Sequence, residues 1–82
     1  DTPDKVLEKK ELNQILNQAL SRLPLEQRQV FIMREKIGLS FKEIAELLNC
    51  SINTALGRMH YAIQNLRKYL NPYLVTFQDS YY

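Results

Sequence analysis

The apolar residues of this chain recur at steps of three and four, and this spacing constrains the fold more than any other feature of the sequence. Such spacing gathers apolar side chains on one side of an α-helix, where they can form a core. Only 2 glycines and 3 prolines interrupt the 82 residues. A chain of this length forms one domain at most, because several elements must share a single core. We therefore predict an all-α domain of four helices.

Two prolines mark the starts of the first two predicted helices. Thr2 supplies a cap and Pro3 a first-turn proline for the first helix. The apolar positions of this helix are Leu12, Ile15, Leu16, Ala19, Leu20 and Leu23. Pro24 then starts a second helix over residues 25–37, and Gly38 is expected to end it in a left-handed conformation.

The third predicted helix is short and the fourth is long. Ser40 and Glu43 are spaced as a capping box, which starts the third helix. The Ser51 hydroxyl is expected to cap the fourth helix. This last helix is predicted to run to Leu70, where the pair Asn71-Pro72 stops it.

The predicted fourth helix has an apolar stripe on one side and small polar residues on the other. The stripe consists of Ile52, Ala55, Met59, Ala62, Ile63, Leu66 and Leu70, with Leu56 at its edge. The opposite face carries Asn53, Thr54, Gly57, Tyr61, Gln64 and Lys68, flanked by Arg58 and His60. A glycine inside a helix costs about 1 kcal/mol relative to alanine. We therefore expect something to approach this face closely.

The third and fourth predicted helices are joined by a tight turn, and the fourth begins with small hydrogen-bonding side chains. This pattern predicts a helix-turn-helix. Its second helix would insert into a DNA major groove, whose base edges present donors and acceptors. Lys42 and the first N–H groups of the preceding helix would meet the phosphate backbone. The alternative is that any small helical bundle contains such a connection, and that Gly57 only lets a neighbouring helix approach.

A longer pattern resembles a known family. Residues 23–70 contain "LP" with "QR" entering the second helix, "RE" before "GLS", "EIA", "CSINT", and Arg58 followed by an apolar residue. This run resembles region four of the bacterial sigma-seventy family, most closely its extracytoplasmic-function group. The resemblance implies a DNA-binding fold that is winged-helix-like but lacks the wing. Residues 1–22 look like the preceding linker and first helix, and residues 71–82 are expected to form a C-terminal tail.

The resemblance also implies a role in transcription initiation. A sigma factor joins the RNA polymerase core to a promoter, and the fourth helix would read the minus-thirty-five element of double-stranded DNA. Apolar surface on the first helices would bind the flap of the polymerase β subunit, and anti-sigma factors in this family often cover the same surfaces. No segment resembles region two, which melts promoter DNA, so we expect the chain to be a fragment.

Carried over by position, the resemblance implies a set of DNA-binding residues. They are Arg34 as a phosphate anchor, Ser51, Asn53 and Thr54 near phosphates or bases, Gly57, His60 and Tyr61 facing bases or sugar, and Arg58 at the arginine position of the family. Together with Lys42 they form the predicted site. Leu56 and Tyr61 stand where many relatives have basic residues, and Gly57 replaces a common serine, so attraction to phosphate is expected to be weaker here.

Three of these residues have alternative roles. His60 would be a metal ligand or catalytic group only with partners, and since no cysteine or carboxylate cluster is near, we expect an exposed histidine at the edge of the DNA site. Tyr61 would either stack at the groove or cover a neighbouring helix with its ring. Arg34 would contact either phosphate or a carboxylate of the protein.

Composition excludes several other classes of protein. The single cysteine, Cys50, rules out an intramolecular disulfide and is expected to be a small buried hydrophobe after Asn49, which tolerates left-handed dihedral angles. No apolar run is long enough to cross a bilayer, so we predict a cytoplasmic protein. No nucleophile, base and orienting group converge on one predicted face, so no enzyme and no cofactor is predicted.

The competing function is a helical protein-interaction module or a stand-alone helix-turn-helix regulator.

Overall fold

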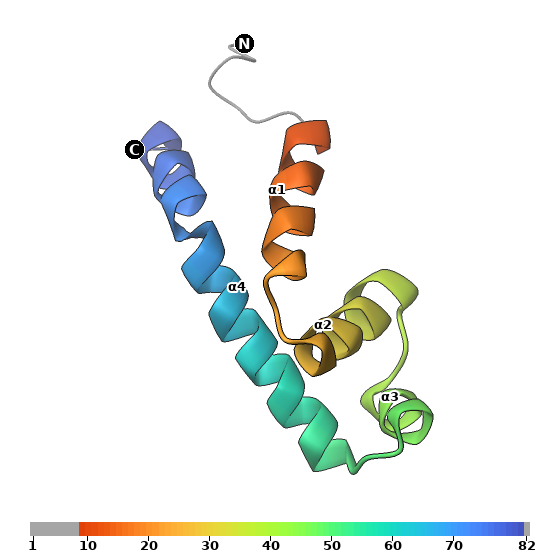
Figure 1. The fold of residues 1–82 in the computed structure, drawn as a ribbon. Helices are drawn as coiled ribbons and strands as arrows, with labels where there is room; N and C mark the ends of the chain where they lie inside the picture. The colour runs from red at the N-terminus through yellow and green to blue at the C-terminus, as the bar shows by residue number, and fades with distance from the viewer. Residues whose placement is uncertain (1–8, 82) are drawn as a thin grey trace.

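The computed structural model describes the backbone of residues 9–81 and the side-chain environments of residues 9–73. The elements are α1 (Lys9–Ser21), α2 (Leu25–Ile32), a π-helical turn η2 (Met33–Ile37), α3 (Phe41–Leu48) and α4 (Ile52–Tyr81). All of them are helical, which confirms the predicted all-α fold (Figure 1). None of the helices within residues 9–81 has the length and apolar character that crossing a membrane requires. The cap expected at Thr2 and the proline at Pro3 lie outside the described residues.

The second predicted helix ends where expected, although its last turn is wider than an α-helical turn. Gly38 has a φ of 86°, which lies in the left-handed region that glycine adopts at little cost. The Met33 carbonyl accepts a hydrogen bond from the Gly38 N–H, and it accepts another from the Leu39 N–H at 3.0 Å. These bonds close η2 and turn the chain toward α3.

Side-chain caps define the starts of α3 and α4. Ser40 Oγ accepts a hydrogen bond from the Glu43 N–H at 3.0 Å, and Glu43 Oε1 accepts one from the Ser40 N–H at 2.8 Å, so the predicted capping box is confirmed. Asn49 follows α3 with a φ of 56°. Ser51 Oγ accepts a hydrogen bond from the Thr54 N–H at 3.0 Å and caps α4. The predicted tight turn between the two helices is therefore present.

The helix α4 packs against all of the other helices. Figure 1 shows α1 beside the C-terminal half of α4, and α2 and α3 beside its N-terminal half. Among the described residues, one buried cluster joins α1 to α4 and consists of Ala19, Leu20, Leu23, Ala62 and Leu66. A second cluster joins α2, α3 and α4 and consists of Val30, Ile44, Ala45, Ala55 and Met59. This second cluster holds the first turns of α4 in place.

Most of the apolar stripe predicted on α4 lies in these clusters. Its buried or partly buried members are Ala55, Met59, Ala62, Ile63, Leu66 and Leu70. Ile52 belongs to the stripe but is 45% exposed. Ile52 is the first residue of α4, so it lies at the end of the helix interface, beyond the buried cluster. Cys50 is partly buried against the second cluster rather than fully buried.

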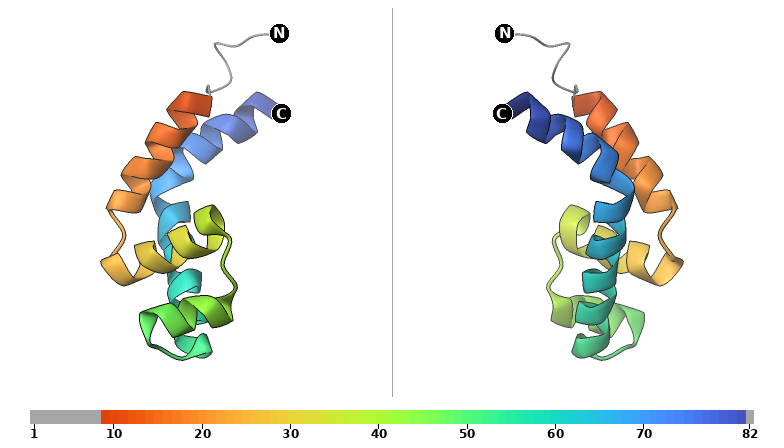
Figure 2. Two further views of the ribbon diagram at one scale, coloured as in Figure 1. Left: turned by 90° about the vertical axis from the view of Figure 1, so that its right-hand side faces the viewer. Right: turned by 90° about the vertical axis from the view of Figure 1, so that its left-hand side faces the viewer.

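The helix α4 does not stop at the pair Asn71-Pro72. The sequence predicts an end at Leu70, but the helix continues through Pro72 to Tyr81, so this prediction is wrong. Proline lacks a backbone N–H and crowds the carbonyl four residues earlier, which bends a helix without always ending it. Figure 2 shows α4 changing direction in its blue C-terminal part. The division into residues 1–22, 23–70 and 71–82 stays a prediction.

Candidate nucleic-acid interface

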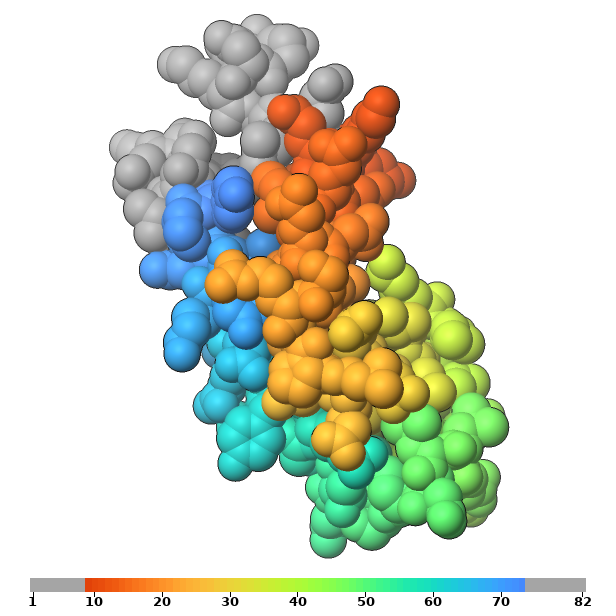
Figure 3. All heavy atoms as spheres, in the orientation of Figure 1, coloured from red at the N-terminus to blue at the C-terminus, as the bar shows by residue number. Residues whose placement is uncertain are grey.

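The turn between α3 and α4 lies at one end of the molecule. Figure 3 shows α3 in green and the first turns of α4 in teal together at that end, away from α1. Asn53 and Thr54 are exposed on the first turn of α4. Gly57 follows on the next turn, and a Cβ added there would meet no heavy atom within 4 Å. Within the described residues no neighbouring helix approaches Gly57, so the alternative role for this glycine is wrong.

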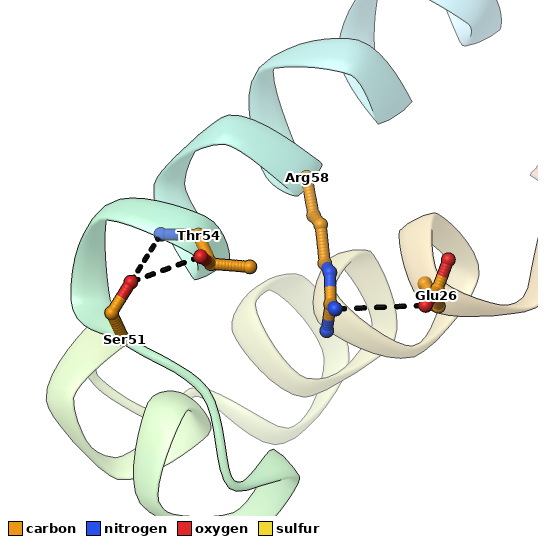
Figure 4. Close-up of polar contacts among 4 residues, drawn as sticks. All are labelled: Glu26, Ser51, Thr54 and Arg58. Atoms are coloured by element: carbon orange, nitrogen blue, oxygen red, sulfur yellow. Dashed lines mark hydrogen bonds and ion pairs between the residues drawn. The ribbon is translucent and has the colours of Figure 1, made fainter.

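The hydrogen bonds that cap α4 leave the Thr54 hydroxyl able to donate a hydrogen bond to a ligand. Ser51 Oγ accepts from the Thr54 N–H and donates to Thr54 Oγ1 at 2.9 Å (Figure 4). A threonine hydroxyl has one proton and two lone pairs. Because Ser51 uses only one lone pair of Thr54 Oγ1, the Thr54 hydroxyl can still donate its proton outward. Ser51 therefore acts mainly by orienting Thr54.

Arg58 forms an ion pair that the sequence did not predict. Its Nη2 lies 3.5 Å from Oε2 of Glu26, in the first turn of α2 (Figure 4). Arg58 is partly buried, whereas Glu26 is exposed. The guanidinium thus lies between α4 and α2, at the flank of the polar face of α4. One carboxylate oxygen at this distance leaves most of the five guanidinium N–H donors of Arg58 available.

Arg34 is held next to the start of α3. Its Nη1 donates a hydrogen bond to the Leu39 carbonyl at 3.0 Å. The guanidinium carbon lies 4.9 Å from the centre of the Phe41 ring, which is a cation–π distance. The sequence left open a contact between Arg34 and a carboxylate of the protein. Within the described residues, neither of these two contacts of Arg34 is with a carboxylate. Arg34 is exposed, so its remaining N–H groups face solvent beside α3.

Lys42 and Ser51 border the same hollow in the surface. This open hollow has a volume of about 360 Å³ and is lined by Lys42, Ala45, Glu46, Asn49, Cys50, Ser51 and Ile52. Lys42 comes from the first turn of α3 and Ser51 from the cap of α4. The fold therefore brings these two predicted site residues together beside the start of α4.

The start of α3 carries a negative charge of its own. The hydrogen bonds from Ser40, first the backbone N–H and then the side chain, hold the pKa of the Glu43 carboxyl below its usual value of 4.5. Glu43 is therefore ionised at neutral pH and lies at the N-terminus where phosphate was expected. This carboxylate already occupies the favourable end of the helix dipole. The predicted phosphate contact at α3 therefore depends on Lys42 rather than on the helix terminus.

His60 and Tyr61 lie exposed on the third turn of α4. Their rings meet edge to face, with centroids 5.6 Å apart and an interplanar angle of 66°. The Tyr61 side chain is 58% exposed, which favours a role at the groove over a role as cover for a neighbouring helix. Among the described residues, no group of three or more histidine, cysteine, aspartate or glutamate side chains is placed to hold a metal ion.

The structure thus places the predicted residues in two groups. One group begins at the Ser51 cap and lies along the outer side of α4, with Asn53, Thr54, Gly57, His60 and Tyr61. The other group consists of three cationic side chains, Arg34 in η2, Lys42 on α3 and Arg58 on the flank of α4. Sequence reasoning missed Glu26 and Phe41, which hold two of the arginines. No local pattern relates either residue to its arginine, because the partners belong to different helical elements.

Comparison with known proteins identifies the family. Residues 13–66 match the family model described as "Sigma-70, region 4". The match covers more than half of the chain, and the chain therefore belongs to this family.

Curated relatives agree with this assignment. The chain is 29% identical over 72 residues to the ECF RNA polymerase sigma-E factor of Haemophilus influenzae, which is 88% of this chain and 38% of that protein. It is 28% identical over 74 residues to the RNA polymerase sigma-H factor of Pseudomonas aeruginosa, covering 90% of this chain and 38% of that protein. The sigma-E factor of Escherichia coli strain K12 is 30% identical over 70 residues, or 85% of this chain and 37% of that protein. The chain therefore spans well under half the length of these relatives.

Proposed function

We propose that this chain binds double-stranded promoter DNA at the minus-thirty-five element, as part of a sigma factor that directs RNA polymerase to initiate transcription. The observation that carries the proposal is the uncovered polar face of α4 beside the α3–α4 turn, in a chain of the sigma-70 region 4 family. A helix-turn-helix places the first turns of its second helix in the major groove, while the first helix crosses the backbone. The short turn that joins α3 to α4 supports this docking.

The residues divide into backbone contacts and base contacts. Arg34, Lys42 and Arg58 bind phosphates, which fixes the register of the protein on the duplex without reading its sequence. The base edges are met by Asn53, Thr54, Gly57 and Tyr61, with Ser51 and His60 beside them. An asparagine side chain can bind the N6 and N7 edge of adenine with two hydrogen bonds.

Arg58 reaches phosphate by exchanging its contact with Glu26. The ion pair is single and 3.5 Å long, whereas a guanidinium can bind a phosphate with two parallel hydrogen bonds. The exchange is therefore favourable once DNA lies against α4.

The proposed partners besides DNA are the RNA polymerase core and an anti-sigma factor. Leu12 on α1 and Leu25 on α2 are exposed apolar side chains, and they supply surface on the first helices for the flap of the β subunit. An anti-sigma factor that covered this surface would prevent assembly with the core. In this proposal the chain acts in the cytoplasm, catalyses no reaction itself and uses no cofactor.

A salt titration tests the proposal. The chain, with and without polymerase core, is titrated with a duplex selected from a random pool and with a scrambled duplex. Three phosphate-binding side chains predict that log K falls with log salt with a slope of about −2.7, because each phosphate contact releases about 0.9 counterion. Lys42→Gln should reduce this slope by about 0.9. Lys68→Gln, on the later turns of α4, is the matched control and should leave the slope unchanged.

The competing function predicts the opposite result. A helical protein-interaction module would associate with a protein partner through apolar contacts that depend little on salt. Absence of salt-dependent duplex binding, even with polymerase core present, would reject DNA recognition.

A further inference from the structure

Leu56 is an apolar side chain at the edge of the polar face of α4. It is 43% exposed and belongs to neither buried cluster of the described residues. Ile52, one turn earlier, is 45% exposed. Residues four apart on a helix are neighbours on its surface, so these two side chains form an exposed apolar pair, the Ile52–Leu56 pair. Packing within the described part of the protein does not account for it.

The Ile52–Leu56 pair is continuous with the candidate DNA interface. Ile52 lines the same hollow as Lys42. Leu56 lies three residues after Asn53, which makes the two neighbours on the helix surface. Gly57, which follows Leu56, has no side chain and meets no neighbouring atom. A base pair that contacts Asn53 can therefore also reach Leu56.

The chemistry of the major groove selects one partner for a leucine. Base edges there present hydrogen-bond donors and acceptors, and the C5-methyl group of thymine is the apolar exception. A leucine that covers a donor or acceptor leaves it without water and without a hydrogen-bond partner, which is unfavourable. A leucine against a methyl group removes apolar surface from water on both sides, which is favourable.

We propose that Leu56 determines specificity at one promoter position by contacting the C5-methyl group of a thymine, with Ile52 shielding the contact from water. This inference rests on the proposed function, because it assigns a base to one side chain of the same interface. It also gives Leu56 a role in DNA binding, although a leucine has no charge with which to attract phosphate.

Deoxyuridine tests the contact, because it removes only the C5-methyl group of thymine and keeps base pairing. The 82-residue chain with polymerase core is titrated with its selected duplex and with duplexes that carry single deoxyuridine replacements. One replacement should weaken binding about fourfold, which corresponds to ~0.8 kcal/mol for one buried methyl group. Leu56→Ala should weaken binding to the thymine duplex and should be insensitive to the same replacement.

Two further variants separate this contact from general effects. Leu47→Ala removes another exposed leucine, 65% exposed, from α3 at a position outside the proposed interface. It should keep the fourfold sensitivity to deoxyuridine. Leu56→Met keeps an apolar side chain and should retain most of the sensitivity. Circular dichroism melting shows that each variant is folded.

The outcomes distinguish this inference from the proposed function. Suppose the wild-type chain binds its duplex with salt dependence, but no deoxyuridine replacement weakens binding, or Leu56→Ala stays sensitive. The thymine contact is then rejected while DNA recognition stands. Absence of duplex binding by the wild-type chain with polymerase core rejects both.

Discussion

A methyl group added at Gly57 is expected to affect stability and DNA binding in opposite directions. Gly57 lies inside α4 with open space where a Cβ would be, so a methyl group fits the folded chain. Gly57→Ala should stabilise the protein by about 1 kcal/mol, because alanine restricts the unfolded backbone more than glycine does. The melting temperature should rise by about 4–8 °C. Thermal unfolding followed by circular dichroism measures this change.

The same variant should bind DNA less tightly. The added methyl group lies on the face that the proposal places against the base edges, where it separates the helix from the groove. A duplex titration of Gly57→Ala beside the wild-type chain measures the loss. A variant that is more stable and binds equally well would show that the groove does not approach Gly57.

Asn53 and Arg34 should differ in the kind of binding that they support. Asn53→Ala should change which duplex is preferred, because a side chain that reads a base discriminates by about 1–3 kcal/mol. Arg34→Ala should weaken binding to all duplexes alike and reduce the salt slope, because phosphate carries no sequence information. Selection from a random duplex pool by each variant separates the two effects. Equal losses on every duplex for Asn53→Ala would refute its role as a base reader.

At the scale of the element, the capping box makes α3 sensitive to pH. The folded-state pKa of Glu43 is lowered by the bonds from Ser40. A carboxyl whose pKa is lower in the folded state stabilises the fold above its unfolded-state pKa, and this contribution is lost as pH falls through the folded-state pKa. The wild-type chain should therefore lose stability between neutral pH and a pH below the usual value of 4.5.

Glu43→Gln is the matched variant for this measurement. Glutamine can also accept the Ser40 N–H hydrogen bond, so the capping box remains while the charge is removed. Urea unfolding of both proteins over this pH range should show the wild-type advantage shrinking as pH falls. Ser40→Ala, by contrast, should cost about 1 kcal/mol because it removes the cap itself. A constant difference between wild type and Glu43→Gln would contradict the role of the carboxylate.

At the scale of the whole molecule, the interface depends on the buried cluster that joins α2, α3 and α4. Ile44 is fully buried in this cluster. Ile44→Ala should destabilise the fold by about 2–5 kcal/mol, because it leaves a cavity among tightly packed side chains. Leu47→Ala, at an exposed position of the same helix, should change stability by no more than about 0.5 kcal/mol. Chemical unfolding measures both, and equal effects would show that α3 does not hold α4 through this cluster.

Much of the fold could be predicted because its signals are local. The helix periodicity, the Ser40–Glu43 capping box, the left-handed Gly38 and Asn49 and the Ser51 cap all depend on residues within one or two turns of each other. The end of α4 could not be predicted in this way. Pro72 weakens the helix locally, but whether α4 bends or ends there depends on how the rest of the helix packs in the fold.

The sequence by itself determined the four helices, the turn between α3 and α4, and the small polar face that is proposed to meet DNA. Only the tertiary structure decided how the site is held: Arg58 beside Glu26, Arg34 over Phe41, and Leu56 outside the core. The physical reason is the distance along the chain over which each interaction acts. Periodicity and capping are properties of neighbouring residues, whereas ion pairs between elements and the exposure of a side chain exist only once separate helices pack together.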